Sequence, residues 1–224
     1  MAGPQLEAAA DALPAGNPAK AWQIPAPMRL RYELSGRSKG LSYSADAVLD
    51  WRQDGQRYQA MLEISAFLVG SRSQTSSGSL GPEGLRPERF VDRARRERVT
   101  QFDHEAGLVR AEADALAMPA GTQDKLSVFI QLALELSGRD APAPGESLTL
   151  PVAGSRAIES WTFDWLGIEE LALPDGPMPA WHLERKAAAG ATRVDIWLAP
   201  ELGWLPARLR LQQDADSIDQ RLRR

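Results

Sequence analysis

Apolar and polar residues alternate along most of this chain, and this period of two limits the possible fold more than any other feature. In segment 28–34 every second residue is apolar, and segment 41–51 repeats the pattern. Successive side chains of a β-strand point to opposite faces, so both segments predict half-buried strands. Asp54 and Gly55 supply a turn into a third alternating segment. An antiparallel meander of three strands is therefore expected.

The alternation continues through the rest of the chain. Segment 71–90 is polar, rich in Ser and interrupted by Gly and Pro, which predicts a strand at an edge or rim of the sheet. Two short strands are expected before residue 121, and several more after residue 145, separated by turns such as 174–177. The total is roughly ten or eleven strands, too many to lie flat without curling or splitting into two layers.

One stretch, residues 121–139, has a helical period and predicts a helix over 123–137. Thr122 can cap its start, Asp124 suits its N-terminal dipole and Gly138 can end it. Apolar residues cover most of its circumference, so we expect the sheet to enclose it. The predicted fold is mainly β, a strongly curved antiparallel sheet or open β-barrel of about ten strands around one main helix. The face expected to be buried consists of Leu126, Phe129, Ile130, Ala133 and Leu134, and a second face of Val128, Leu132 and Leu136.

The composition excludes several classes of function. The chain has no Cys and only two His, so disulfides, thiolate nucleophiles, metal sites and metal cofactors are not expected. Its net charge of -4 gives no basic excess for a nucleic-acid partner. No run approaches the ~20 apolar residues of a transmembrane helix. We expect a monomer without a cofactor.

The beginning of the chain differs from the rest. Residues 1–25 are rich in Ala and Pro and have no persistent period, so they predict a flexible leader, with Trp22 and Ile24 anchoring its end. The leader looks like the mature start of an exported protein, with Met1 added on expression. Residues 26–224 are expected to form a single curved β-sheet domain, because a chain with 43% hydrophobic residues can bury a full core.

Three segments in order, "TQDKLSVFIQLA", "SWTFDWLGIEELALPDG" and "VDIWLAPELGWLPARLRL", resemble a bacterial exported family catalogued as domain of unknown function 3108. The resemblance covers residues 28–222. It implies a periplasmic or otherwise exported envelope protein of a Gram-negative bacterium, made with a signal peptide, whose curved sheet is similar to those of periplasmic lipoprotein carriers. It implies no known activity and carries over no catalytic residues.

Two polar groups could carry chemistry. Lys125 and Ser127 could act as base and nucleophile, but no G-x-S-x-G elbow supports this, and we favour a solvated Lys125 beside a helix start. His182 and Glu184 share one face of a strand and, with Asp195, could form an acid/base cluster. A polar ladder across a solvated face is the interpretation that we favour. His104 is expected at the surface.

The basic stretch 86–98 could hold an anionic lipid head group, a phosphorylated sugar or an acidic partner. Charges that protect a solvated sheet edge from aggregation are the favoured interpretation.

The aromatic residues give the main functional hypothesis. A curved sheet around one helix tends to leave a concave apolar space, which is a default ligand site. We therefore predict a non-enzymatic envelope protein that binds a lipid or other hydrophobic ligand. The alternatives are a module that docks on an envelope complex through an edge at 71–98, and, as a third option, a hydrolase that uses His182. The predicted ligand-binding residues are Trp161, Phe163, Trp165, Phe129 and Leu132, with Arg96 or Arg98 at the rim.

Overall fold

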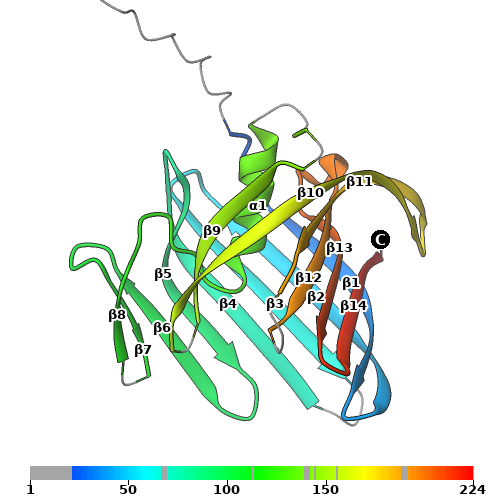
Figure 1. Ribbon diagram of the computed structural model, residues 1–224, viewed down its shortest axis with the longest axis horizontal. Helices are drawn as coiled ribbons and strands as arrows, with labels where there is room; N and C mark the ends of the chain where they lie inside the picture. Colours follow the sequence, from blue (N-terminus) through cyan, green and yellow to red (C-terminus); the bar gives the residue numbers. More distant parts are fainter. Residues whose placement is uncertain are drawn as a thin grey trace, which may run out of the picture.

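The computed structural model describes residues 22–223, with gaps at 67–69, 113, 139–141, 144, 155 and 188–190. These residues form one antiparallel sheet of 14 strands, which is not closed, and one short α-helix. The sheet curves strongly and wraps around α1 (Figure 1). The predicted mainly β fold class is confirmed.

The first eight strands precede the helix. They are β1 (Met28–Ser38), β2 (Leu41–Gln53), β3 (Arg57–Ala66), β4 (Gly70–Gly81), β5 (Gly84–Arg93), β6 (Glu97–Asp103), β7 (Leu108–Ala111) and β8 (Asp114–Ala117). The helix and the remaining elements are α1 (Ser127–Ser137), β9 (Ser147–Ala153), β10 (Ile158–Leu173), β11 (Gly176–Arg185), β12 (Arg193–Leu198), a 3-10 turn η1 (Pro200–Leu202), β13 (Pro206–Gln213) and β14 (Asp216–Arg223).

The strands follow one another in two runs that meet at the ends of the chain. The order across the sheet is β8 to β1 and then β14 to β9, so each strand in a run pairs with its neighbour in sequence. The two runs are joined by an antiparallel β1–β14 pair, in which Tyr32 lies opposite Leu222. The sheet ends at β8 and β9, and a short parallel bridge from Gln123 to Val152 extends the β9 edge.

The polar segment 71–90 is not an edge, contrary to expectation. It forms two strands, because Gly81 and Gly84 flank a tight turn, and β4 lies between β3 and β5 deep inside the sheet. Its small residues leave space for the start of the helix, where Ser76 is fully buried. The split of this segment also explains part of the difference between 14 strands and the ten or eleven predicted.

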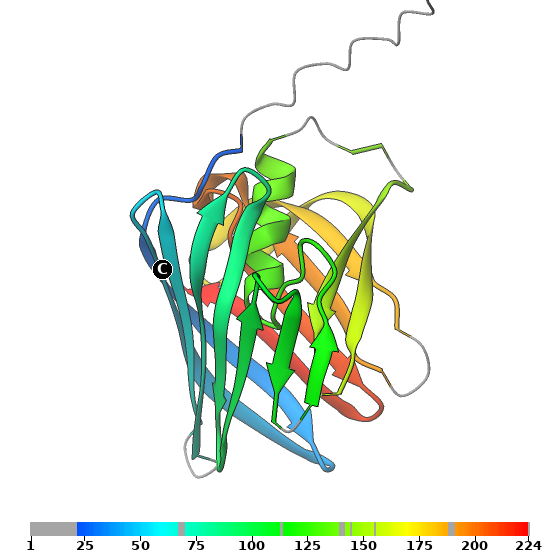
Figure 2. The same cartoon turned by 90° about the vertical axis from the view of Figure 1, so that its left-hand side faces the viewer.

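We call the face of the sheet that turns toward α1 the inner face. On β1 it carries Leu30, Tyr32 and Leu34, which form one buried cluster with Leu126 and Leu134 of the helix segment. A second buried cluster lies between the other side of the helix and β9–β13. Figure 2 shows α1 within the upper half of the curved sheet, while the strands continue well below its first turn. The helix is enclosed, as the sequence predicted.

The helix begins later than predicted. Its first residue is Ser127, because the backbone at Gln123 is extended and bonds to Pro151 and Ala153 of β9. Thr122 is not the cap, since its hydroxyl donates to the carbonyl of Pro119. One residue of the predicted buried face differs as well, because Phe129 is only half-buried.

Most of the predicted leader, residues 1–21, lies outside the described residues. The described part begins at Trp22, which packs against the core as predicted, whereas Ile24, the other predicted anchor, is exposed. The amide of Gln23 donates to the hydroxyl of Ser137 at the end of α1, and the indole N–H of Trp51 donates to the carbonyl of Pro25. Among the described helices, none has the length and hydropathy that a membrane crossing requires.

Candidate functional site

The start of α1 is fixed inside the sheet by a buried carboxylate. Asp124 accepts hydrogen bonds from the backbone amides of Leu126 and Ser127, both at 2.8 Å, and from the hydroxyl of Ser76 at 2.5 Å. Ser76 is in turn 3.0 Å from the hydroxyl of Tyr58. Burial raises the pKa of Asp124 above its ordinary value, and these hydrogen bonds oppose the rise. The group is thus a helix anchor, and Ser127 is bound to it and buried, which leaves no room for a Ser-Lys nucleophile.

The predicted aromatic wall comes together as a packed cluster. Trp161, Phe163 and Trp165 project from the inner face of β10 and are buried, and Leu132 of α1 is buried against the same cluster. Phe129 lies beside them, with its ring centroid 6.4 Å from that of Trp161, and is half-buried. A ligand on this wall would have to displace that packing, except at Phe129.

The two predicted rim arginines lie apart from the aromatic cluster. Arg96 is in the exposed turn between β5 and β6, and Arg98 follows it on β6, where it pairs with Glu112 at 3.3 Å. A row of directly opposed residues crosses β2–β6 and places Arg98 on the inner face; its members are Leu49, Leu62, Gln74, Asp92 and Arg98.

A second row of residues crosses the inner face on β11–β14, buried on β11 and β12 and accessible on β13 and β14. Its members Ile218, Leu211, Val194 and Arg185 lie directly opposite one another on adjacent strands. Leu211 and Ile218 are only half-buried, although both face the helix side. Together with Tyr43 and Thr192 they line a pocket of about 200 Å³ near the β13–β14 turn. Leu211 and Ile218 therefore form an apolar wall that solvent can reach, in a pocket that Arg37, Asp216 and other polar residues also line.

Arg185 ends this row. Its guanidinium lies over the indole of Trp161, 4.3 Å from the ring centroid, and donates to the carbonyl of Thr192 in the pocket wall. The carboxylate of Glu159 is 3.5 Å away and also accepts from the indole N–H of Trp161 at 3.1 Å. Burial lowers the pKa of Arg185, and the charge of Glu159 partly opposes this. The side chain is nine-tenths buried and faces inward.

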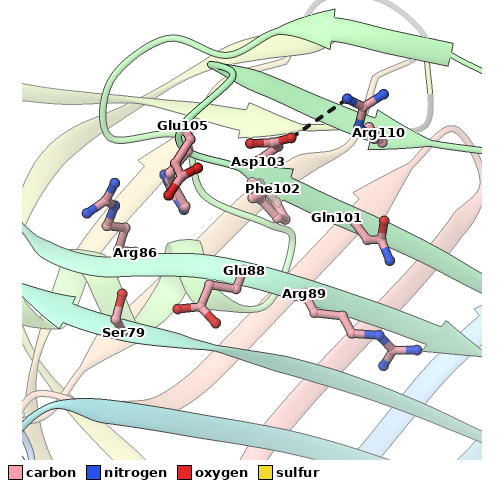
Figure 3. A pocket seen from close by; sticks show the side chains of 10 residues that line it. Ser79, Arg86, Glu88, Arg89, Gln101, Phe102, Asp103, Glu105 and Arg110 are labelled. Atoms are coloured by element: carbon pink, nitrogen blue, oxygen red, sulfur yellow. Dashed lines mark ion pairs between the residues drawn. The ribbon is translucent and has the colours of Figure 1, made fainter.

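A larger pocket of about 550 Å³ lies on the outer face, over β4–β7 (Figure 3). Two of its acidic residues are paired, since Glu88 is held by Arg57 and Asp103 lies 3.7 Å from Arg110. The side chains of Arg86 and Arg89 point away from one another in Figure 3, so they do not converge on a common anion. The lining residues are Ser79, Arg86, Glu88, Arg89, Gln101, Phe102, Asp103, His104, Glu105 and Arg110.

The predicted His182 cluster exists and is buried rather than solvated. His182 Nε2 is 3.2 Å from Asp195, and Glu184 lies opposite Asp195 but binds Arg193. Two partners were not predicted. Glu169 contacts His182 Nδ1 at 2.7 Å and accepts from the indole of Trp197 at 2.8 Å, and the His182 and Trp197 rings stack with centroids 4.2 Å apart.

The contacts of this cluster hold the side chains of His182 and Trp197 in fixed positions, which is a structural role. Both ring nitrogens of His182 are engaged by carboxylates, and Arg208 covers the other face of Trp197, 4.7 Å from its centroid. His182 lines neither the pocket near the β13–β14 turn nor the pocket over β4–β7. Its imidazole is buried and held by its carboxylate and aromatic neighbours. His104, the other histidine, is half-buried and its Nε2 contacts the carbonyl of Pro87 at 2.6 Å.

Sequence reasoning did not identify Arg185, Leu211 or Ile218 as site residues. Arg185 follows the alternation of "WHLER" and falls in phase with Trp181 and Leu183, which are inner residues. A charged residue in an inward phase was the signal that could have pointed to it.

A family model described as "Protein of unknown function (DUF3108)" matches residues 31–223. No curated protein matches the chain. Among solved structures, a β-barrel-like protein of the domain of unknown function DUF1849 from Brucella abortus is similar, with 12% identity, a TM-score of 0.62, and coverage of 90% of this chain and 97% of that chain. A DUF1329 family protein from Desulfovibrio piger matches at 13% identity over 87% of this chain and 82% of that chain, with a TM-score of 0.29. The first likeness shows a shared fold. The second, with its low TM-score, supports no conclusion about this chain.

Proposed function

The chain belongs to the DUF3108 family of unknown function, and we propose that it is a non-enzymatic protein of the bacterial cell envelope that binds a hydrophobic ligand on the inner face of its sheet. The observation that carries the proposal is the half-buried apolar wall formed by Leu211 and Ile218 beside the pocket near the β13–β14 turn. Apolar side chains that line a concave site together are a common feature of ligand pockets.

The position of the wall differs from the one that the aromatic residues predicted. The predicted wall is already packed, because its side chains bury one another in a single cluster that contains Trp161, Phe163, Trp165 and Leu132. The ligand in our proposal therefore lies below them, along Leu211 and Ile218, and reaches the aromatic cluster only at Phe129. A pocket of about 200 Å³ holds part of a ligand, and the rest lies along the open inner face.

A curved sheet around one helix is the general plan that the family resemblance led us to expect from periplasmic lipoprotein carriers. This analogy supports the proposal at the level of the fold only. The envelope location rests on the same resemblance. Fractionation of the native bacterium tests it, because detection of the protein only with cytosolic markers would contradict the location.

Binding can be tested with a fluorescent fatty acid. We expect saturable binding that quenches tryptophan emission and is reversed by an unlabelled envelope lipid. Ile218→Trp should fill the wall and weaken binding at least tenfold. Ser44→Trp, which adds the same ring to an exposed position of β2, should leave it unchanged. Equal binding by both folded variants, or no saturable binding by the unmodified protein, would overturn the proposal.

A further inference from the structure

We infer that the ligand is a single-chain anionic amphiphile whose carboxylate or phosphate head group binds Arg185, while its apolar chain lies along Leu211 and Ile218. This inference rests on the proposed function and names the class of molecule that the same wall would take.

The charge of Arg185 is incompletely matched inside the protein. A guanidinium has five N–H donors, and buried charges are normally paired and hydrogen-bonded. Among the described residues, the carboxylate that contacts it is that of Glu159, at 3.5 Å, and Glu159 is more than half exposed and shared with Trp161. A second anion beside Arg185 would therefore complete the pairing.

Arg185 is also in the right place to meet a ligand. Its guanidinium donates to the carbonyl of Thr192, and Thr192 lines the same pocket as Leu211 and Ile218. The cation consequently lies directly behind the pocket wall. The ring of Trp161 holds it from one side, so the guanidinium is presented in a fixed orientation.

The row of opposed residues changes from charged to apolar along its length. Arg185 is on β11, Val194 on β12, Leu211 on β13 and Ile218 on β14. Adjacent strands are about 4.8 Å apart, so three steps place the apolar end of the row roughly 14 Å from the cation. An amphiphile has the same sequence of charge and hydrocarbon, and an arginine is well suited to carboxylate and phosphate oxygens.

The other charged surfaces fit a ligand less well. The outer pocket of Figure 3 has Phe102 as its single apolar lining residue, and two of its acidic groups are already paired, Glu88 with Arg57 and Asp103 with Arg110. On the inner face, Arg72 is held by Asp92 with two hydrogen bonds and Arg98 pairs with Glu112. Arg185 is the inner-face arginine of the described strands with the weakest carboxylate contact.

The test uses three probes with the same twelve-carbon chain: dodecanoate, dodecyl phosphate and dodecanol. Each is titrated into the full chain below its micelle concentration, with displacement of a fluorescent fatty acid as the readout. We expect at least one of the two anions to bind tenfold or more tightly than the alcohol. Raising the salt concentration should reduce this preference and leave dodecanol binding unchanged. The stronger of the two anions identifies the head group.

The Arg185→Gln variant should bind all three probes with the affinity of dodecanol for the unmodified protein. Arg210→Gln is the matched control, since Arg210 lies on β13 but faces outward, opposite Asp195 and Asp219. If Arg185→Gln does not fold, Arg185→Lys keeps the charge and should retain a preference for anions that salt weakens.

The outcomes separate this inference from the proposed function. If dodecanol binds as tightly as both anions, the ligand is hydrophobic but not anionic, and only the inference fails. If none of the three binds, the proposed function itself fails. An anion preference that survives in Arg185→Gln would move the head group elsewhere and overturn the inference.

Discussion

The hydroxyl of Ser76 donates a 2.5 Å hydrogen bond to the fully buried carboxylate of Asp124, which joins the middle of β4 to the segment that starts α1. The two residues are 48 positions apart in sequence. This bond connects a strand of the first run to the helix before the second run begins. It accounts for a serine between two apolar residues, Ala60 and Phe90, which lie directly opposite Ser76 on β3 and β5.

Ser76→Ala should lower the free energy of unfolding by about 2 kcal/mol, because it leaves one oxygen of a buried carboxylate without its donor. Ser77→Ala, the adjacent and outward-facing position, should change it by less than ~0.5 kcal/mol. Urea unfolding followed by tryptophan fluorescence measures both. Similar values for the two variants would show that the bond does not hold the helix start.

Asp124 should also give stability an unusual dependence on pH. Burial raises its pKa in the folded protein, so the folded state binds the proton more tightly than the unfolded chain. Its contribution is complete below the unfolded pKa of about 3.9 and is lost as the pH rises through the raised folded value. The stability of the unmodified protein relative to Asp124→Asn should therefore fall with rising pH. A difference that grows over the same window would contradict the assignment.

Asp219 should behave in the opposite way. Burial raises its pKa, but hydrogen bonds from Arg208 and Arg221 outweigh burial and hold it below its ordinary value. Its contribution is present above the unfolded pKa of about 3.9 and is lost as the pH falls through the lowered folded value. Asp219→Asn should be less stable than the unmodified protein at pH 7, and the gap should close in acid. Thermal unfolding at both pH values decides this.

Truncating two side chains of α1 should show which of its faces is buried, because the loss of unfolding free energy depends on burial. Leu134 is completely buried, whereas Phe129 is half-buried beside Trp161. Leu134→Ala should cost about 3 to 4 kcal/mol, and Phe129→Ala, although it removes more atoms, only about 2 kcal/mol. Denaturant unfolding compares them. A larger loss for Phe129→Ala would mean that its ring is covered in solution.

The contacts around His182 predict that two neighbouring glutamates contribute differently to the free energy of unfolding. Glu169 accepts from Trp197 and contacts His182, while Glu170 is exposed and faces the other side of β10. Glu169→Ala should reduce the free energy of unfolding by about 1 kcal/mol, since half of its side chain is solvated. Glu170→Ala should have almost no effect. Equal effects would show that the contacts of Glu169 contribute nothing measurable.

The strands and the enclosed helix could be predicted because their periods are local properties of the sequence. Tyr32 and Leu34 reveal their inward phase in a window of a few residues, and Leu134 reveals a helix in the same way. The position of β4 could not be predicted, because small polar residues such as Ser76 and Gly78 are typical of a solvated sheet edge. Only the distant partner of Ser76, Asp124, explains why Ser76 is buried. The start of α1 was misplaced for the same reason, because Gln123 is held extended by β9, nearly thirty residues later.

The candidate site shows the same limit. The phases of Trp161 and Phe163 were visible in sequence, but their packing against Leu132 was not, since it depends on how the helix is inserted. The lining of the proposed ligand wall comes from β2, β13 and β14 together. Register between strands that far apart in sequence is set by the whole sheet, and one residue cannot indicate it.

The pairing of β1 with β14 has a consequence for how the protein is made. A ribosome delivers β1 before the other described strands, yet one side of β1 keeps its amides and carbonyls unpaired until β14 has emerged. Bringing together segments so distant in sequence is entropically costly and slow. An unpaired strand edge invites association with other chains in the meantime. The centre of the sheet is therefore the last place to complete its pairing, and removal of β14 would expose the middle of the sheet rather than its margin.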